Sequence, residues 1–218
     1  MNDDLKLQQR VIDELDFEPV VDAAHIGVSV RDGVVTLSGH VGSYIEKYEA
    51  ERAARRVRGV RAVAQELTVE LPNDKKTADD EIAARALKLL NWDGLVPDDR
   101  LSLRVEHGIV TLGGEVDWRY QRDEAESDMR KLGGVKGVIN NIRVRPGADP
   151  DDVSVRIRDA LERNADLEAD GITVEVSGGL VTLRGRVAAR AERDAVERAV
   201  WSTPGVSQVM DHLEIVRQ

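Results

Sequence analysis

Two of the four histidines, His25 and His40, flank a segment with the pattern of a β-hairpin. The pairing expected for that hairpin places them directly opposite each other. Directly opposed side chains of an antiparallel pair have Cβ atoms about 5 Å apart, so two imidazoles there can share a metal ion. A third ligand is not evident in the sequence, and a pair of solvated histidines is the alternative interpretation.

Two acidic runs offer carboxylates that a divalent cation could use. They are residues 79–81 (Asp-Asp-Glu) and 149–152 (Asp-Pro-Asp-Asp). Oxygen ligands suit such cations, but both runs stand where helices are expected to begin. Carboxylates in a first helical turn accept hydrogen bonds from free N–H groups and interact favourably with the helix dipole. The sequence therefore favours helix capping over a metal site.

Basic residues gather near the expected end of one helix. Cations are stabilising at a helix C-terminus, and contact with an anion or a lipid headgroup is the alternative. Arg55 and Arg56 are the candidates for such a contact. The cluster comprises Arg52, Arg55, Arg56, Arg58 and Arg61.

Aromatic residues form only 3% of the chain, so pairs of them are informative. Trp118 and Tyr120 stand at the expected start of a helix, and Tyr44 and Tyr48 begin the corresponding helix nearer the N-terminus. Aromatic side chains at an exposed helix tip can enter a membrane interface or seat a partner. Burial against an adjoining part of the chain is the alternative. Trp118 and Tyr120 are the first candidates for a binding contact.

Motifs typical of catalysis are missing from the sequence. It has no Gly-x-Ser-x-Gly elbow, no His-Glu-x-x-His, no phosphate-binding loop and no dinucleotide fingerprint. Four histidines and no cysteine leave few nucleophile–base pairs. We therefore predict no enzymatic activity and no cofactor.

A phrase that occurs three times shows how these residues are positioned. It reads Gly-Val-Val-Thr-Leu-Ser-Gly at 33–39, Gly-Ile-Val-Thr-Leu-Gly-Gly at 108–114 and Gly-Leu-Val-Thr-Leu-Arg-Gly at 179–185. The offsets are 75 residues (108 − 33) and 71 residues (179 − 108). Periods this long indicate a small domain copied in tandem. The expected domains span residues 1–72, 77–146 and 149–218, joined by short linkers at 72–76 and 146–149.

Each copy predicts the order α-β-β-α-β. An aliphatic triplet at i, i+4 and i+8 precedes the phrase and marks one face of an amphipathic helix. The triplets are Leu7, Val11 and Leu15; Ile82, Ala86 and Leu90; and Val153, Ile157 and Leu161.

A two-residue turn is expected at the start of each phrase, and its second residue is the first glycine of the phrase. Asp32-Gly33 is a strong signal for a type I′ turn, Gly178-Gly179 fits equally well and His107-Gly108 less well. Closing the first turn pairs Val30 with Val35, Val28 with Leu37 and Ile26 with Gly39, which puts the apolar residues on one face.

A second helix and a third strand complete each copy. The helices are expected at 44–58, 118–133 and 189–202, and the strands at 63–71, 138–144 and 209–216. A strand reached through a helix is parallel to its neighbour, with a right-handed crossover. The predicted fold class is α+β, with two helices on one face of a three-stranded mixed sheet in each of three tandem units.

The combined pattern resembles the BON domain, named after bacterial osmotically inducible and nodulation proteins. The resemblance rests on Gly-x-Val-Thr-Leu-x-Gly, a helix, Gly-Val-x-x-Val and a closing Leu-x-Val or Ile-x-Val. The closing segments begin at Gly59, Gly134 and Gly205. The resemblance implies an α-β-β-α-β fold. It also implies a binding role, since the family includes domains that bind phospholipid headgroups and a cytoplasmic potassium-binding protein.

Composition narrows the partners and the location. A formal net charge of −10 disfavours nucleic acid and anionic lipid as bulk partners. The absence of cysteine excludes disulfides. The first ten residues lack the basic and apolar regions of a signal peptide, which predicts a cytoplasmic protein.

Two functional classes follow. The first is a non-enzymatic, stress-related interaction module that docks on a phospholipid membrane or a protein partner. The second is a cytoplasmic sensor of an ion, such as a potassium-like monovalent cation, or of a small ligand.

Overall fold

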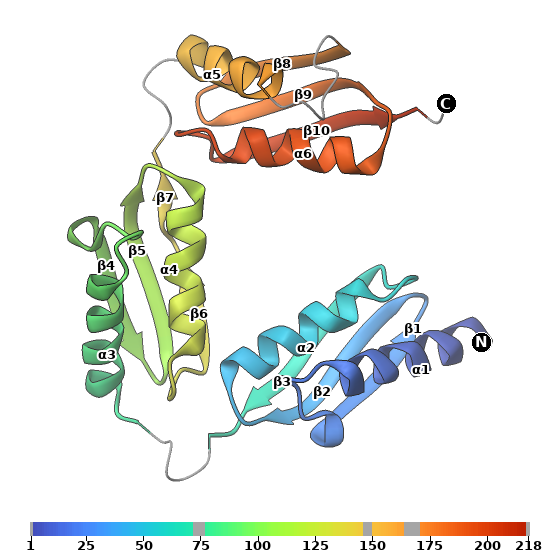
Figure 1. Ribbon diagram of the computed structural model, residues 1–218. Helices are drawn as coiled ribbons and strands as arrows, with labels where there is room; N and C mark the ends of the chain where they lie inside the picture. The colour runs from blue at the N-terminus through green and yellow to red at the C-terminus, as the bar shows by residue number, and fades with distance from the viewer. Residues whose placement is uncertain (1, 72–76, 146–149, 164–170, 217–218) are drawn as a thin grey trace. The chain divides into compact units, whose positions relative to one another are not determined.

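The computed structural model describes residues 2–71, 77–145, 150–163 and 171–216. Both expected linkers lie outside these ranges, as do positions 1, 72, 146, 149 and 218, where expected domains begin or end. The described residues form three copies of one α-β-β-α-β arrangement (Figure 1). This confirms the predicted class of three α+β repeats, and each repeat is described on its own.

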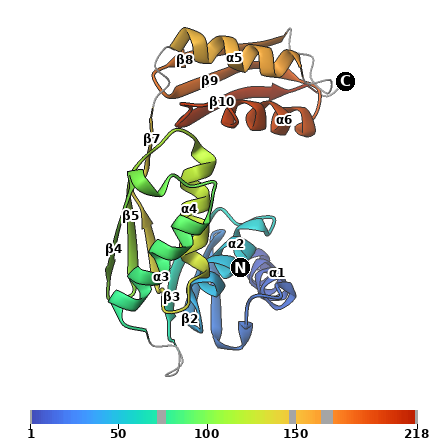
Figure 2. The same cartoon turned by 60° about the vertical axis from the view of Figure 1, so that its left-hand side comes forward.

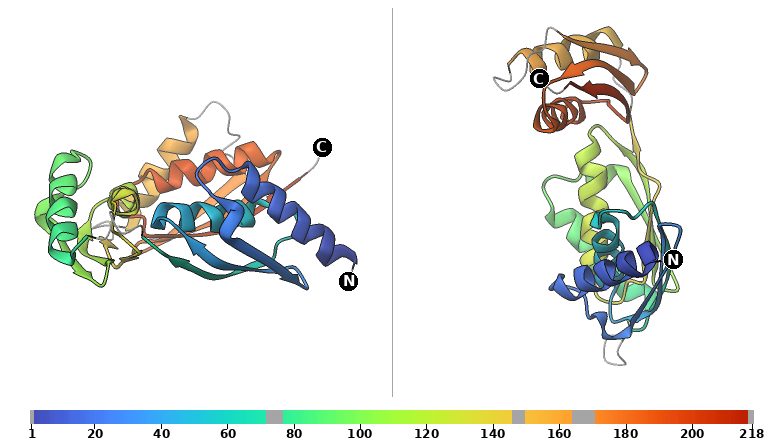
Figure 3. Two further views of the ribbon diagram at one scale, coloured as in Figure 1. Left: turned by 90° about the horizontal axis from the view of Figure 1, so that it is seen from below. Right: turned by 90° about the vertical axis from the view of Figure 1, so that its right-hand side faces the viewer.

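The first repeat has two helices on the same side of its sheet (Figure 3, left). A short 3₁₀ turn, η1, leads into the first strand. The elements are α1 (Asn2–Phe17), η1 (Ala23–His25), β1 (Ile26–Arg31), β2 (Val34–Val41), α2 (Tyr44–Arg56) and β3 (Ala62–Val69).

The second repeat repeats this order, with α3 and α4 beside the sheet (Figure 2). Its last strand, expected to be continuous, is divided into two short pieces that both pair with β5. The elements are α3 (Asp79–Trp92), η3 (Asp98–Arg100), β4 (Leu101–Glu106), β5 (Ile109–Val116), α4 (Arg119–Lys131), β6 (Gly137–Asn140) and β7 (Arg143–Val144).

The third repeat has an undivided last strand, as the first repeat does. Its elements are α5 (Pro150–Glu162), β8 (Ile172–Ser177), β9 (Leu180–Val187), α6 (Arg190–Trp201) and β10 (Gln208–Ile215). The second helix of every repeat is slightly shorter than predicted. In the first repeat the N–H of Val57 bonds to the carbonyl of Ala54 at 3.2 Å, and this tight turn ends α2 before Gly59.

The predicted strand register is confirmed. In β1 and β2, Ile26 pairs with Gly39, Val28 with Leu37 and Val30 with Val35 in antiparallel fashion. The strand after the second helix is parallel to the central strand in the first and third repeats. The third repeat reproduces the hairpin register, with Val174 opposite Leu183.

The two-residue turn is found in the first and third repeats where it was predicted, between Arg31 and Val34 and between Ser177 and Leu180. The type I′ geometry is right in the first and second repeats and wrong in the third. Asp32 and Gly33 have φ of 52° and 79°, and His107 and Gly108 have φ of 53° and 79°, as a type I′ turn requires. In the third repeat Gly178 has φ of 58°, but Gly179 is not among the residues with positive φ. A positive φ at the first position alone fits a type II′ turn, which a Gly-Gly pair adopts equally well.

The predicted core residues are buried. All nine residues of the first-helix triplets belong to the buried core, together with Leu37, Leu112 and Leu183 of the central strands. Ala50 and Ala54 line α2 where it lies against the sheet, and their small side chains let the helix approach closely. Among the described residues, no helix combines the length and the apolar character needed to span a bilayer.

Candidate functional site

The exposed ends of α1 and α3 carry a large aromatic side chain at the same position of the repeat. Phe17 is 83% exposed and Trp92 is 89% exposed, and residue 17 plus the 75-residue offset is residue 92. Three residues further on, Val20 and Leu95 are also exposed. The third repeat has Arg163 at the corresponding position (92 + 71). We call Phe17 with Val20, and Trp92 with Leu95, the two apolar tips.

The local structure explains why the tips face solvent. After α1 the chain turns sharply, and the N–H of Val21 bonds to the carbonyl of Glu18 at 3.0 Å. Val21 packs on the core, so its neighbour Val20 is directed outward. The second repeat has the same turn, in which Val96 is buried beside the exposed Leu95. An aliphatic residue that packs inward, partly buried Val21 or buried Val96, thus anchors each apolar tip.

Trp118 and Tyr120 lie together at the start of α4, as predicted. Their ring centroids are 6.0 Å apart with an interplanar angle of 43°. Tyr120 is 48% exposed, whereas Trp118 is half-buried. A role of this pair in binding stays a prediction, and it offers less exposed aromatic surface than the apolar tips.

The candidate residues of the first repeat lie on α2, at other repeat positions than Trp118 and Tyr120, whose counterparts are Ser43 (118 − 75) and Ile45 (120 − 75). Tyr44 and Tyr48 are half-buried along α2. Arg55 is exposed and forms an ion pair with Glu51 at 2.7 Å, one turn earlier on the same helix. A binding role for these three residues stays a prediction.

Arg56 joins the two helices of the first repeat. Its Nη2 atom lies 2.7 Å from a carboxylate oxygen of Glu18 and 3.0 Å from one of Glu14. Glu14 lies on α1, and Glu18 directly follows that helix. Hydrogen bonds to Glu18 and Glu14 raise the pKa of the Arg56 guanidinium. Because this charge is already compensated, Arg56 is a weak candidate for an anion or lipid contact.

His25 and His40 come together as the register predicted. Their rings are stacked with centroids 4.6 Å apart and an interplanar angle of 17°. Neither belongs to a group of three or more metal-ligand side chains among the described residues. Shared metal binding by His25 and His40 therefore stays a prediction for a two-ligand site.

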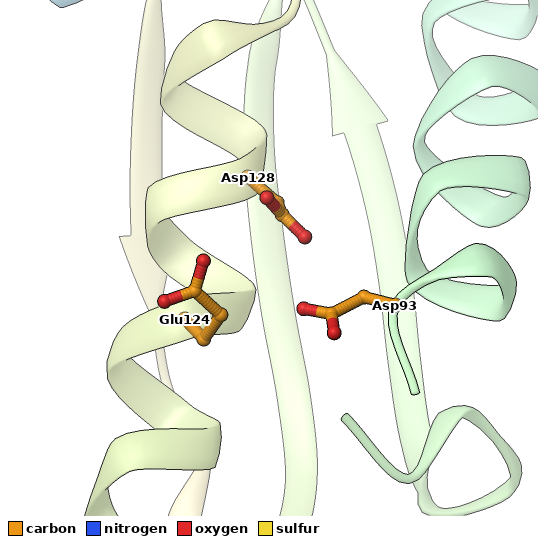
Figure 4. A group of neighbouring side chains, drawn as sticks. All are labelled: Asp93, Glu124 and Asp128. Carbon is orange, nitrogen blue, oxygen red and sulfur yellow. The ribbon is translucent and has the colours of Figure 1, made fainter. Parts of the chain in front are cut away.

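A different group has the geometry of oxygen ligands. Carboxylate oxygens of Asp93, Glu124 and Asp128 all lie within 4.8 Å of one another. Figure 4 shows Glu124 and Asp128 on α4 and Asp93 just after α3, with the Asp93 and Asp128 side chains directed toward each other. Asp128 is 7% exposed, and Lys131 Nζ lies 3.4 Å from its Oδ1. Groups of acidic residues are common without an ion, so the trio alone does not define a metal site.

The sequence could not identify this trio. Glu124 and Asp128 are four residues apart on one helix, which is a visible pattern, but Asp93 joins them only through tertiary packing. The first repeat has Glu18, Glu49 and Ala53 at the corresponding positions. The trio is thus a feature of the second repeat.

In the acidic run at 79–81, for which helix capping was favoured, Asp79 bonds to the backbone of a β-turn. Asp79 accepts hydrogen bonds from the backbone N–H groups of His107 at 2.7 Å and Gly108 at 2.9 Å. Asp4 accepts the equivalent pair from Asp32 and Gly33 at 3.1 and 3.4 Å. The first-turn carboxylate thus ties the first helix to the β-hairpin. In the run at 149–152, Asp149 lies outside the described residues and Asp152 pairs with Arg156 at 2.8 Å.

Comparison with known proteins identifies the family. The profile described as BON domain matches residues 3–70, 78–146 and 149–217. The chain belongs to the BON domain family. Three BON domains therefore account for the repeated helices, hairpins and crossovers.

A curated relative extends the comparison. The chain is 33% identical over 129 residues to the Osmotically-inducible protein Y of Escherichia coli (strain K12). The match covers 57% of this chain and 64% of that protein, so it spans less than two thirds of the relative.

Solved structures show only distant likeness. CdsD, a structural protein of the type III secretion system of Chlamydia trachomatis, aligns with 98% of this chain and 93% of its own at 14% identity, with a TM-score of 0.29. A structure of the CdsD C-terminal domain covers 97% and 98% at 14% identity, with a TM-score of 0.28. Scores this low do not extend the interpretation of the BON repeats.

Proposed function

We propose that this BON protein is a stress-related, non-catalytic module that docks on a phospholipid surface through its two apolar tips. The observation that carries the proposal is the exposure of Phe17 and Trp92, at 83% and 89%, at the same position of two repeats. Exposed side chains of this size lose contact with water only when something covers them. Trp suits a membrane interface because its indole combines an apolar body with a polar N–H group, and Phe adds apolar surface.

The family and its relative support this role. BON membership agrees with a binding module, and the name of the E. coli relative connects a similar chain with osmotic induction. The second repeat contributes the larger apolar tip, since Trp92 and Leu95 are both more than half exposed.

The net charge of the protein determines which vesicles it is expected to bind and how salt affects that binding. At a net charge of −10, long-range attraction to an anionic membrane is unfavourable. Docking through apolar side chains does not need that attraction. We expect binding to zwitterionic vesicles, and binding to anionic vesicles that strengthens with salt because salt screens the repulsion.

The test is sedimentation with phosphatidylcholine vesicles. Phe17→Arg and Trp92→Arg introduce the residue that the third repeat carries at the same position, Arg163. We expect each to reduce vesicle recovery and the double variant to abolish it. Leu5→Arg is the matched control, because Leu5 is 62% exposed near the other end of α1.

Full recovery of the double variant with its melting temperature unchanged would contradict phospholipid docking. Saturable binding of the wild type to a protein, lost in the same double variant, would instead assign the tips to a protein partner. The non-catalytic part is tested separately with ester, phosphate and glycoside substrates, on which turnover should stay at background. The cytoplasmic location expected from the sequence stays a prediction, which fractionation of cells tests.

A further inference from the structure

The third repeat contains a hollow between the ends of α5 and α6. Its volume is about 440 Å³, and it lies wholly within this repeat. The lining residues used below are Arg156, Ala160, Arg163, Ala199, Ser202 and Thr203.

In the first repeat, larger side chains occupy two of the positions that line this hollow in the third repeat. Residues 14 and 56 plus the combined offset of 146 residues (75 + 71) are residues 160 and 202. In the first repeat these positions are Glu14 and Arg56, whose ion pair at 3.0 Å spans the two helices. The third repeat has Ala160 and Ser202 instead, so both the internal carboxylate and its guanidinium partner are replaced by small side chains.

Two guanidinium groups remain beside the hollow. Arg156 donates through Nε to Asp152 at 2.8 Å, which leaves its Nη donors for another acceptor. For Arg163, the structure shows no side-chain hydrogen bond or ion pair within residues 150–163 and 171–216. A planar guanidinium fork matches the oxygen spacing of phosphate and carboxylate groups.

The end of α6 forms one wall of the hollow and offers an anion no donor. A helix C-terminus has partial negative charge on its free carbonyl groups. Here the Ser202 hydroxyl donates to the carbonyl of Arg198 at 2.8 Å, and the Thr203 hydroxyl donates to that of Ala199 at 3.2 Å. The Arg198 carbonyl also accepts from the backbone N–H of Ser202 at 3.0 Å, so both carbonyls have hydrogen-bond donors within the repeat. The two side-chain bonds commit both hydroxyl protons, so recognition depends on the two arginines.

We propose that this hollow binds a phosphate group, held by Arg156 and Arg163. The ligand takes the place that the Glu14 carboxylate occupies in the first repeat. A free phosphate ester and a phospholipid headgroup share this chemistry. The site is independent of the apolar tips, which belong to the first and second repeats.

The test is isothermal titration of the full chain with inorganic phosphate and with glycerol 3-phosphate. We expect saturable binding at one site, weakened about tenfold or more by Arg156→Gln or Arg163→Gln, since each removes charge-assisted hydrogen bonds. Arg158→Gln is the matched control, because Arg158 lies on the same helix but bonds to Ser154 at 3.2 Å. Its affinity should equal that of the wild type.

Ala160→Glu provides the decisive variant. It restores the carboxylate found at the corresponding position of the first repeat, which should fold and should compete with phosphate for the arginines. Loss of binding with the melting temperature retained supports the site. Displacement of bound glycerol 3-phosphate by phosphatidic acid vesicles assigns a phospholipid headgroup site, and binding of the soluble anions without such displacement assigns a free phosphate or phosphate ester site. Absence of binding, retained binding in Ala160→Glu, or equal weakening by Arg158→Gln would overturn the proposal.

Discussion

The carboxylate of Asp79 accepts a hydrogen bond from the backbone N–H of Gly108 at 2.9 Å, and so joins the first turn of α3 to the β4–β5 turn. The hydrogen bonds from Gly108 and His107 lower the pKa of Asp79. In the first repeat Asp4 does the same. The third repeat has Pro150 at this position and lacks the carboxylate.

We predict that Asp79→Asn lowers the unfolding midpoint at neutral pH. The folded-state pKa is lower than the unfolded one, so the stabilisation is complete above the unfolded pKa of about 3.9 and is lost as pH falls through the folded pKa. Urea titrations at neutral and at acidic pH measure this. The difference from wild type should shrink with acidification, and the exposed Asp80→Asn serves as control. A constant difference at every pH would exclude the carboxylate as the cause.

The central leucines should each matter strongly. Leu37, Leu112 and Leu183 have no exposed surface. Replacement of each by Ala should reduce the free energy of unfolding of its repeat by about 2–5 kcal/mol, through lost burial and an unfilled cavity. Denaturant unfolding monitored by circular dichroism measures the loss. Losses under about 1 kcal/mol at all three would show that the cores are assigned incorrectly.

Gly114 should not tolerate a side chain. Its φ is 110°, and a Cβ atom there would collide with the backbone carbonyl oxygen of Arg100. Gly114→Ala should therefore cost about 1–3 kcal/mol of stability. Gly94→Ala is the matched control in the same repeat, since a Cβ there meets nothing within 4 Å. Equal melting temperatures of the two variants would contradict the steric explanation.

The aromatic pairs at the starts of α4 and α2 can be compared by their effect on binding. We predict that replacing Trp118 and Tyr120 with Ala weakens vesicle or partner recovery more than replacing Tyr44 and Tyr48. The reason is that Tyr120 is exposed while both first-repeat tyrosines are half-buried. Recovery is measured after circular dichroism has shown both variants folded. Loss confined to the first-repeat variant would reverse the assignment.

The third repeat should respond to pH through one carboxyl pair. The pKa of Glu197 is raised mainly by its hydrogen bond to Asp211 and secondly by burial. A raised folded-state pKa means that the stabilisation is complete below the unfolded pKa and is lost as pH rises through the folded one. In the second repeat Asn140 occupies the position of Asp211 and donates to Glu126 at 3.0 Å.

Asp211→Asn should therefore remove this decline, because an amide donor needs no shared proton. The variant also loses the ion pair between Asp211 and Arg193 at 2.6 Å. We therefore expect its melting temperature to vary less with pH than that of the wild type, without being higher at neutral pH. Melting temperatures from about pH 4 to pH 7 test it. A slope equal to that of the wild type would contradict the shared proton.

Much of the fold follows from local pattern. The spacing of Leu7, Val11 and Leu15 defines a helix face, and the Asp32-Gly33 turn fixes the pairing of Val28 with Leu37. These features depend on residues close in sequence. The type of the Gly178-Gly179 turn was not predictable, because two glycines allow several turn types and the surrounding structure selects one of them.

The candidate sites were less predictable. Asp93 meets Glu124 and Asp128 only through packing of α3 beside α4, which no local pattern encodes. Phe17 and Trp92 resemble core residues when each is considered alone. The 75-residue offset between them was a usable signal, because it places an aromatic residue at the same helix end twice.

The common strand order of the three sheets has a consequence for assembly. Every central strand carries Val-Thr-Leu in the same position, with a locally paired hairpin partner on one side and a strand that returns through a helix on the other. During refolding, the last strand of one repeat can pair with the central strand of another repeat, or of a second chain, because the central strands have nearly the same sequence. Exchange of such elements is the characteristic misassembly of tandem copies. Refolding at high protein concentration should therefore yield a larger share of domain-swapped species than refolding at low concentration.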